Sequence, residues 1–321
     1  MKYKKYIGIA LGAMYGVAIR LLMNPIENGI KLYDIYNLYS VTFIWITPII
    51  IGIIPVILAK KEILESRLRQ FTYPVLSVLS FFTVAITSRI EDWICLLILV
   101  LPFLIGAGLA GILTATIIER IDSKKLYSIL FLPVILGVME ARLPNHKESF
   151  EVNSTIEINA TKSIVWNYLI EVPEITNDEY EKGIFNFLGI PRPIKSQLEI
   201  IDGIKYRVGY FSDNLKLAES IESIDSLTSV SFKIHLDKSQ LRDSPTDVHI
   251  LKGQYFKFRN ISYHLEEVQG NTLLTLKCNY EIDSKMNFYG NFWAKQIIND
   301  FEERLLNSLK RKIEMDNSEA L

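Results

Sequence analysis

The chain divides into a half rich in long apolar segments and a half in which apolar and polar positions alternate. Apolar runs cover residues 6–23, 41–59, 71–88, 93–118 and 126–140. A helix needs about 20 apolar residues to cross the ~30 Å hydrocarbon core of a bilayer. The last run is shorter and contains Pro133, which favours either a tilted, kinked crossing or a segment at the interface. We therefore expect an all-α transmembrane bundle of about five helices over residues 1–143, followed by a separate water-soluble domain over 144–321.

The positions of Lys and Arg predict the orientation of this bundle, because positively charged loops stay on the cytoplasmic side. Most of these residues fall in the N-terminal tail and in the second and fourth loops: Lys2, Lys4, Lys5, Lys60, Lys61, Arg67, Arg69, Arg120, Lys124 and Lys125. The N-terminus is therefore expected in the cytoplasm. The C-terminal domain lies outside the cytoplasm if the fifth run crosses, and inside if it does not.

One helix stripe in the first run combines small residues with a cation. Gly8, Gly12, Gly16 and Arg20 follow each other at i, i+4 spacing, which predicts close helix packing. Arg20 lies near the end of its run, where its side chain is expected to reach the lipid headgroups. The interiors of the other runs carry no ionisable side chains, so the sequence predicts an anchor or scaffold and not an ion pathway.

The second half has the pattern of an α+β domain. An alternating segment over 150–158 predicts a half-buried strand, and a short helix is expected between Thr161 and Pro173. Strand-like runs follow at 194–201, 204–211, 215–224, 228–236, 254–267 and 272–282. Asp202-Gly203 and Gly270-Asn271 are tight-turn signals between such runs, so an antiparallel meander is expected.

A long amphipathic helix is expected over residues 286–314. Its predicted apolar stripe consists of Trp293, Ile297, Phe301, Leu305, Leu309 and Ile313, and Glu302 is placed outside that stripe. An antiparallel sheet with one apolar face needs a cover, and this terminal helix is the element available for it. A helix that crosses a strongly curved sheet leaves room beneath it, so we expect a cavity between the two.

Composition and motifs exclude several classes of function. A net charge of −1 without a clustered basic segment argues against a nucleic-acid partner. The chain has two cysteines, Cys95 and Cys278, one on each side of the predicted domain boundary, so no disulfide framework is expected. Common phosphate, metal and acyl-transfer motifs are absent from the sequence, and we expect neither a cofactor nor a metal site.

Candidate site residues are few. His249 and Asp247 share a predicted loop and are weak candidates for proton transfer, although such a pair also arises by chance. Arg192 lies between two prolines and either belongs to a rigid turn or binds an anionic head group at a pocket entrance. The candidate ligand-binding aromatic residues, most of them expected in the core, are Tyr206, Tyr210, Phe232, Tyr255, Tyr280, Phe292 and Trp293.

Two strings and the order of elements resemble a known superfamily. The opening ESFEVNSTIEINATKSIVWNYLIEVPEI and the helix that follows YEID are similar to the START-like (SRPBCC) superfamily, which has the helix-grip fold and includes polyketide cyclases, dehydratases and lipid-transport domains. The apolar runs, together with GIPRP (189–193) and VHILKGQYFKF (248–258), resemble bacterial membrane-anchored members. The resemblance implies a pocket for an apolar or amphipathic ligand and names no reaction.

The expected function is therefore a membrane-anchored binding module for a lipid or another hydrophobic small molecule. Its partners would be that ligand and the lipid bilayer of a bacterial cytoplasmic membrane. One alternative is a cyclase-like or dehydratase-like enzyme that uses the same pocket, although binding is favoured over catalysis. The other is an interaction module without a functional pocket.

Overall fold

The computed structural model describes residues 4–22, 40–59, 65–118, 128–253 and 255–319. The chain forms two compact units. Unit 1 comprises Met1–His146 with Ser284–Met286, and unit 2 comprises Lys147–Asp283 with Asn287–Leu321. Each unit has its own buried side chains.

Unit 1 is helical. Its described elements are α1 (Lys4–Leu22), η2 (Thr42–Ile46), α2 (Thr47–Ile57), α4 (Arg67–Thr87), α5 (Trp93–Ile118) and α6 (Leu132–Ala141). Small residues let these helices approach closely, because a Cβ added at Gly52 of α2 would lie 2.4 Å from the carbonyl oxygen of Ala107 on α5. The rings of Phe43, Phe81 and Phe103 pack together in the interior.

The prediction of about five membrane-crossing helices is wrong. Within the described residues, two helices, α4 and α5, are long and apolar enough to cross a membrane. The other apolar helices there, Tyr6–Leu22, Thr42–Ile57 and Ser128–Ala141, have only 10–17 residues. The length of an apolar run exceeds the length of the helix within it, because the run includes flanking residues that are not helical. Residues 58 and 59, after the end of α2, are an example. The prediction placed on 126–127 lies outside the described residues.

The interior of unit 1 contains charges that the sequence pattern placed elsewhere. The Arg20 guanidinium is 3% exposed and pairs with the buried carboxylate of Glu91, so it does not extend outward as expected. Glu140, at the end of α6, accepts hydrogen bonds from the main-chain N–H groups of Val41 (2.8 Å) and Thr42 (2.9 Å). A carboxylate at a helix N-terminus satisfies N–H groups that have no partner within the helix.

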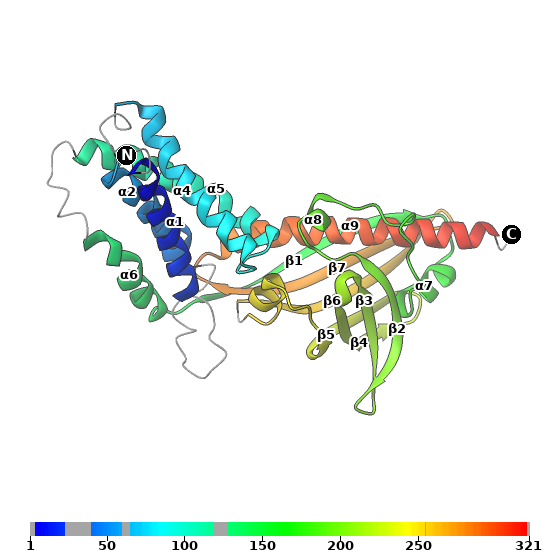
Figure 1. Cartoon of the computed structure of the whole chain (residues 1–321). Helices are drawn as coiled ribbons and strands as arrows, with labels where there is room; N and C mark the ends of the chain where they lie inside the picture. The colour runs from blue at the N-terminus through cyan, green and yellow to red at the C-terminus, as the bar shows by residue number, and fades with distance from the viewer. Residues whose placement is uncertain (1–3, 23–39, 60–64, 119–127, 254, 320–321) are drawn as a thin grey trace. The chain divides into compact units, whose positions relative to one another are not determined.

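Unit 2 is an antiparallel sheet with helices (Figure 1). Its strands are β1 (His146–Ile158), β2 (Pro193–Ile201), β3 (Ile204–Phe211), β4 (Lys216–Asp225), β5 (Ser229–Gln240), β6 (Phe256–Val268) and β7 (Asn271–Ser284). The helices and turns are α7 (Lys162–Ile170), α8 (Ile184–Phe187), η4 (Ser212–Asn214), η5 (Asp247–Leu251) and α9 (Asn287–Glu319). The strand order is β1-β7-β6-β5-β4-β3-β2, and each consecutive pair from β2 to β7 is antiparallel. The expected antiparallel sheet and long C-terminal helix are both present.

Tight turns set the register of this meander. Asp202 and Gly203 both have positive φ (52° and 79°), as a two-residue hairpin turn requires, and they join β2 to β3 as predicted. The turn between β6 and β7 is Gln269-Gly270, with φ of 53° and 86°, one residue earlier than predicted. Glycine accepts positive φ without strain, so the turn centres on Gly270 together with the residue before it.

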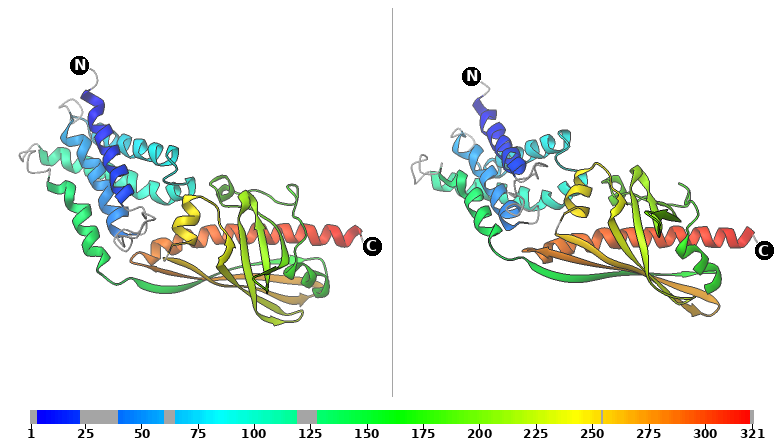
Figure 2. Two further views of the ribbon diagram at one scale, coloured as in Figure 1. Left: turned by 60° about the horizontal axis from the view of Figure 1, so that its bottom comes forward. Right: turned by 90° about the horizontal axis from the view of Figure 1, so that it is seen from below.

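Helix α9 lies along the sheet, as the two views of Figure 2 show. Its buried apolar residues are Ile298, Leu306, Leu309 and Ile313, and Glu302 is buried among them. The predicted stripe was therefore displaced by one residue over most of its length, because it followed the largest side chains while the sheet contacts the neighbouring row. That displacement moves Glu302 from the expected exposed face into the interior.

Candidate functional site

The most unusual side chain in unit 2 is the carboxyl group of Glu302. It is 2% exposed and lies four residues after Ile298 and four residues before Leu306, within the buried stripe of α9. The hydroxyl of Ser154, on β1, donates a hydrogen bond of 2.9 Å to Oε2. The other oxygen, Oε1, is buried and has no hydrogen-bond partner among the described residues. The site therefore contains a polar atom that the protein itself leaves unsatisfied.

Burial determines the protonation of this group. Removal from water raises the pKa of Glu302 to about 8, and the negative charges of Glu151 and Glu303 act in the same direction. The Ser154 hydrogen bond opposes the shift without reversing it. At neutral pH the carboxyl group is therefore mostly protonated and uncharged.

A buried ion pair occupies the same side of the sheet. Arg207 of β3 lies opposite Glu219 of β4 and forms an ion pair with it, and both side chains are under 10% exposed. The guanidinium also donates to the Ile170 carbonyl (3.0 Å) and stacks 4.8 Å from the centroid of the Phe232 ring. Burial raises the pKa of Tyr263 to about 12, and that hydroxyl interacts electrostatically with both Arg207 and Glu302. Tyr263 thus connects the ion pair to the buried acid.

Two apolar clusters flank these polar groups. The larger cluster joins α7, the central strands and the C-terminal part of α9, and contains Phe232, Leu276 and Leu306. The smaller cluster contains Val152, Phe256, Cys278, Tyr280, Ile282 and Ile298. Ile261 packs against both clusters. Because Ile298 belongs to one cluster and Leu306 to the other, Glu302 lies where the two meet.

The aromatic residues predicted to bind a ligand lie on different faces of the sheet. Phe232 and Tyr280 belong to the clusters beneath α9, where the Tyr280 hydroxyl donates to Asn291 (2.7 Å). Tyr206 instead packs with Val208 and Ala218 in a third cluster, to which Tyr210 adds a partly buried ring. Alternation along β3 turns Tyr206 and Tyr210 away from the side on which Arg207 lies.

The remaining aromatic candidates lie near the ends of elements. Phe292 of α9 is 54% exposed, and Trp293 is half-buried with its ring 5.3 Å from that of Phe292. Tyr255 is half-buried just before β6, and its carbonyl accepts a hydrogen bond from the Asp283 N–H (2.9 Å). None of these three residues belongs to the apolar clusters around Glu302.

Arg192 contacts the loop that follows α7. Its guanidinium donates to the carbonyl of Ile175 (3.1 Å) and lies 6.0 Å from the centroid of the Tyr180 ring. These contacts join the segment before β2 to the loop after α7. Pro193 begins β2, and both interpretations of Arg192, a rigid turn and the binding of an anionic head group, stay predictions.

Asp247 and His249 lie in the short η5 turn. The Asp247 side chain is 1% exposed and accepts hydrogen bonds from both the main-chain N–H (2.8 Å) and the guanidinium (2.6 Å) of Arg242. Arg242 also donates to the Gly189 carbonyl (2.8 Å), so this ion pair holds the turn in place. His249 is half-buried in the same turn. A catalytic role for the two residues stays a prediction.

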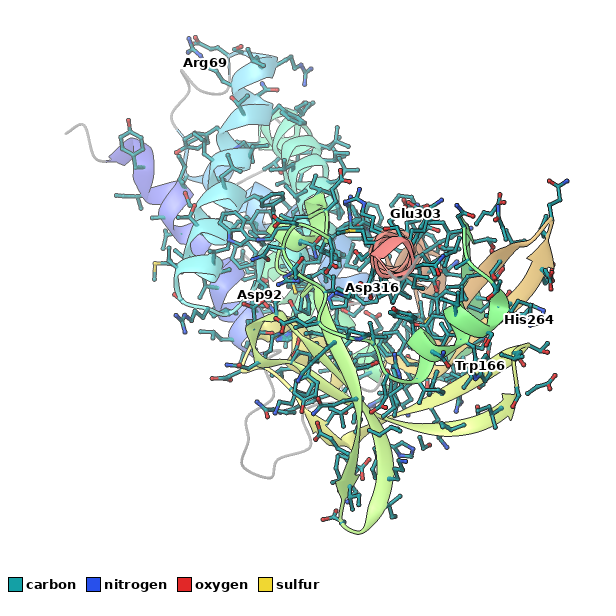
Figure 3. The ribbon with its side chains drawn as sticks, turned by 90° about the vertical axis from the view of Figure 1, so that its right-hand side faces the viewer. Arg69, Asp92, Trp166, His264, Glu303 and Asp316 are labelled. Atoms are coloured by element: carbon teal, nitrogen blue, oxygen red, sulfur yellow. The ribbon has the colours of Figure 1, made fainter. Side chains whose placement is uncertain are left out.

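Figure 3 views α9 end-on, with Glu303 and Asp316 labelled on it. Asp316 accepts a hydrogen bond from the Tyr168 hydroxyl of α7 (2.8 Å), and Lys312 pairs with Glu179 (3.1 Å). These contacts fix the rotation of α9 about its axis, and that rotation places Glu302 against the sheet. Among the described side chains, no group of three or more His, Cys, Asp or Glu residues is arranged to hold a metal ion.

Sequence reasoning missed Glu302 and Arg207. Glu302 interrupts an apolar row between Ile298 and Leu306 at i, i+4 spacing, whereas Arg207 lies on the face of β3 opposite to Tyr206 and Val208, beside Lys205 and Gly209. The available signal was Ser154, a polar residue on the apolar face of an alternating strand. A charge in line with an apolar stripe becomes recognisable only when the rotation of the helix is known.

Among known proteins, this chain is similar to solved structures only at the level of structure. No family model and no curated protein matches the chain. Solved structures similar to it include an uncharacterised protein from Rhizobium leguminosarum, with 12% identity over 54% of this chain and 99% of that one and a TM-score of 0.33. Major latex-like protein 151 from Panax ginseng is 16% identical over 52% of this chain and 97% of that one, with a TM-score of 0.30. Norcoclaurine synthase from Thalictrum flavum is 9% identical over 54% of this chain and 96% of that one, with a TM-score of 0.32. Proteins with the helix-grip fold are among these neighbours.

Proposed function

We propose that unit 2 binds a hydrophobic small molecule between its sheet and α9, with a polar group of that molecule at Glu302. The observation that carries this proposal is the buried Oε1 atom, which has no protein partner in the described chain. An unsatisfied buried polar atom costs about 1–3 kcal/mol, so this oxygen is stabilised by a partner that does not come from the described protein residues. The apolar clusters on both sides of Glu302 supply surroundings suited to the rest of the ligand.

Extraction of the purified full-length chain tests this proposal. Wild-type protein is expected to retain an apolar molecule that organic solvent releases and mass spectrometry identifies. The Glu302→Leu variant should retain far less, while its fold becomes no weaker, because leucine needs no hydrogen-bond partner at a buried position. Glu303→Leu, at the exposed neighbouring position, is the matched control and should bind as the wild type does. A wild-type protein that neither retains nor takes up any apolar molecule would contradict the proposal.

Acid catalysis is a second candidate for the same group. A carboxyl group with a pKa of about 8 is protonated near neutrality, which suits a general acid. A binding module returns its ligand unchanged, whereas an enzyme returns a different compound. Recovery of an altered ligand from wild-type protein, together with recovery of the unaltered ligand from Glu302→Gln, would favour catalysis over simple binding.

We further propose that unit 1 resides in a lipid bilayer, with α4 and α5 crossing it. Along α5, a row of apolar side chains at i, i+4 spacing is at least 40% exposed: Leu101, Ile105, Leu109, Leu113 and Ile117. This row extends over about 24 Å of helix. Exposed apolar surface in water costs about 25 cal/mol per Å², a cost that contact with lipid removes. The Arg20–Glu91 ion pair keeps these two charges away from such a surface.

Accessibility to quenchers tests the lipid contact. A fluorophore attached at Leu109→Cys is expected to be quenched by a lipid-soluble quencher and protected from a water-soluble one in reconstituted vesicles. The same label at Ser223→Cys, an exposed position in unit 2, should show the opposite behaviour. Equal access of the water-soluble quencher to both positions would contradict insertion. A cytoplasmic N-terminus stays a prediction.

A further inference from the structure

The arrangement of hydrogen bonds around Glu302 restricts the chemistry of its partner. Ser154 donates its single hydroxyl proton to Oε2 at 2.9 Å, whereas the alternative acceptor, Oδ1 of Asn299, is at 3.4 Å. The Asn299 amide in turn donates to Glu303 (2.8 Å), which directs its oxygen toward Ser154. With Oε2 accepting a hydrogen bond, the proton of the carboxyl group belongs on Oε1, which is the atom without a partner.

The side chains that interact electrostatically with Glu302 are acidic or uncharged. Glu151 of β1 and Glu303 of α9 both disfavour a further negative charge beside them. From β6 and β7, Tyr263, Tyr280 and Cys278 face the carboxyl group, and burial raises the pKa of each, so all three stay uncharged at neutral pH. The guanidinium of Arg207, which interacts with Tyr263, is already paired with Glu219. An anionic ligand group would thus be buried without a compensating cation, which is strongly unfavourable.

We infer that the polar group of the ligand is an uncharged hydrogen-bond acceptor of the carbonyl type, which accepts a hydrogen bond from Oε1 of the protonated Glu302. This inference rests on the proposed function. An ammonium group would deprotonate Glu302 and form an ion pair, but burial of two charges costs several kcal/mol per ion unless further hydrogen bonds satisfy them. A neutral carbonyl avoids that cost, because it supplies the acceptor that Oε1 lacks and leaves the site uncharged.

Three probes of one alkyl chain length separate the alternatives: a methyl ketone, an alkyl sulfonate and a primary alkylamine. Each is added to the full-length chain in lipid nanodiscs, and bound probe is counted by native mass spectrometry. The ketone is expected to bind at least tenfold more tightly than the sulfonate or the amine at pH 6.5. Its binding should weaken roughly 30-fold at pH 9.5, because only about 3% of a group with a pKa of about 8 keeps its proton there.

Variants identify the group responsible. Glu302→Gln keeps a hydrogen-bond donor and should bind the ketone with little dependence on pH, whereas Glu302→Leu should lose the preference for the ketone. Stronger binding of the sulfonate or the amine would overturn the carbonyl assignment while leaving the proposed binding function intact. Failure of all three probes to bind would instead contradict the proposed function itself.

Discussion

Single buried charges in unit 2 are accommodated in two different ways. Arg207 and Glu219 form an ion pair, and the guanidinium makes further contacts to a main-chain carbonyl and an aromatic ring. Glu302 has no such partner and remains protonated instead. The difference depends on whether an oppositely charged side chain lies nearby. An ionised buried group needs an opposite charge within about 4–6 Å, and a protonated acid does not. Loss of one partner would therefore leave an unpaired buried charge at the ion pair, whereas Glu302 is buried without an opposite charge.

Removal of one partner from the ion pair should weaken unit 2 strongly. Arg207→Ala leaves the buried Glu219 carboxylate uncompensated, and such changes cost about 3–5 kcal/mol. The rate at which a thiol reagent labels buried Cys278 measures the opening of unit 2, and it is expected to rise by two orders of magnitude or more. Lys238→Ala removes the exposed pair with Asp202 and should change that rate little. Equal rates in the two variants would contradict the structural role of Arg207.

Close contact between α2 and α5 in unit 1 depends on Gly52, which lies against Ala107. In Gly52→Ala the new methyl group would meet the Ala107 backbone at 2.4–2.9 Å, and backbone cannot yield cheaply. We expect a loss of about 1–3 kcal/mol and faster labelling of buried Cys95. Gly106→Ala, where the nearest atom is 3.3 Å away on a proline ring, is the control and should be tolerated much better. Unchanged Cys95 labelling in Gly52→Ala would show that α2 and α5 are not in this contact.

At the scale of elements, α9 shows how one rotation determines a site. The helix is held by the Tyr168–Asp316 hydrogen bond and the Lys312–Glu179 ion pair on one side and by the apolar clusters on the other. A rotation of one residue, about 100°, would return Glu302 to the exposed face that the sequence pattern assigned to it. The packing of α9 therefore determines the burial of Glu302.

The buried row of α9 predicts which of its residues stabilise unit 2. Leu309→Ala removes a side chain that is 1% exposed and should cost about 2–5 kcal/mol. Met315→Ala lies on the same helix at 53% exposure and should cost less than 1 kcal/mol. Hydrogen exchange of peptides from β7 measures both effects, with faster exchange expected only in Leu309→Ala. Similar exchange in the two variants would mean that α9 packs with a different face.

For the molecule as a whole, the protonation of Glu302 makes the stability of unit 2 depend on pH. Its pKa rises from an ordinary value of 4.5 to about 8 on folding. Below pH 4.5 both states bind the proton and the stabilisation is fully present. Between pH 4.5 and 8 the unfolded chain releases the proton while the folded one keeps it, so the free energy of unfolding falls by about 1.4 kcal/mol per pH unit, and it levels off above pH 8.

Comparison of the wild type with Glu302→Gln isolates this contribution. Hydrogen exchange of β7 peptides is measured for both proteins at each pH, and the ratio of the two rates cancels the intrinsic effect of pH on exchange. The ratio should change steadily between pH 5 and 8 and remain constant above pH 9. A ratio that does not change with pH would mean that the carboxyl group is already ionised in the folded state.

The sequence by itself determined the antiparallel meander and the terminal helix. Alternation over residues such as 272–282 and turn residues such as Asp202-Gly203 are local signals that the backbone obeys directly. Hydropathy identified the apolar residues, but it did not determine how many of them belong to one continuous helix. It therefore overestimated the number of helices that can cross a membrane. Only the tertiary structure decided that Glu302 and Arg207 face the interior and that Tyr206 and Tyr210 face away. The physical reason is that the rotation of a helix against a sheet and the path of a curved strand depend on contacts between segments distant in sequence, and no local pattern encodes them.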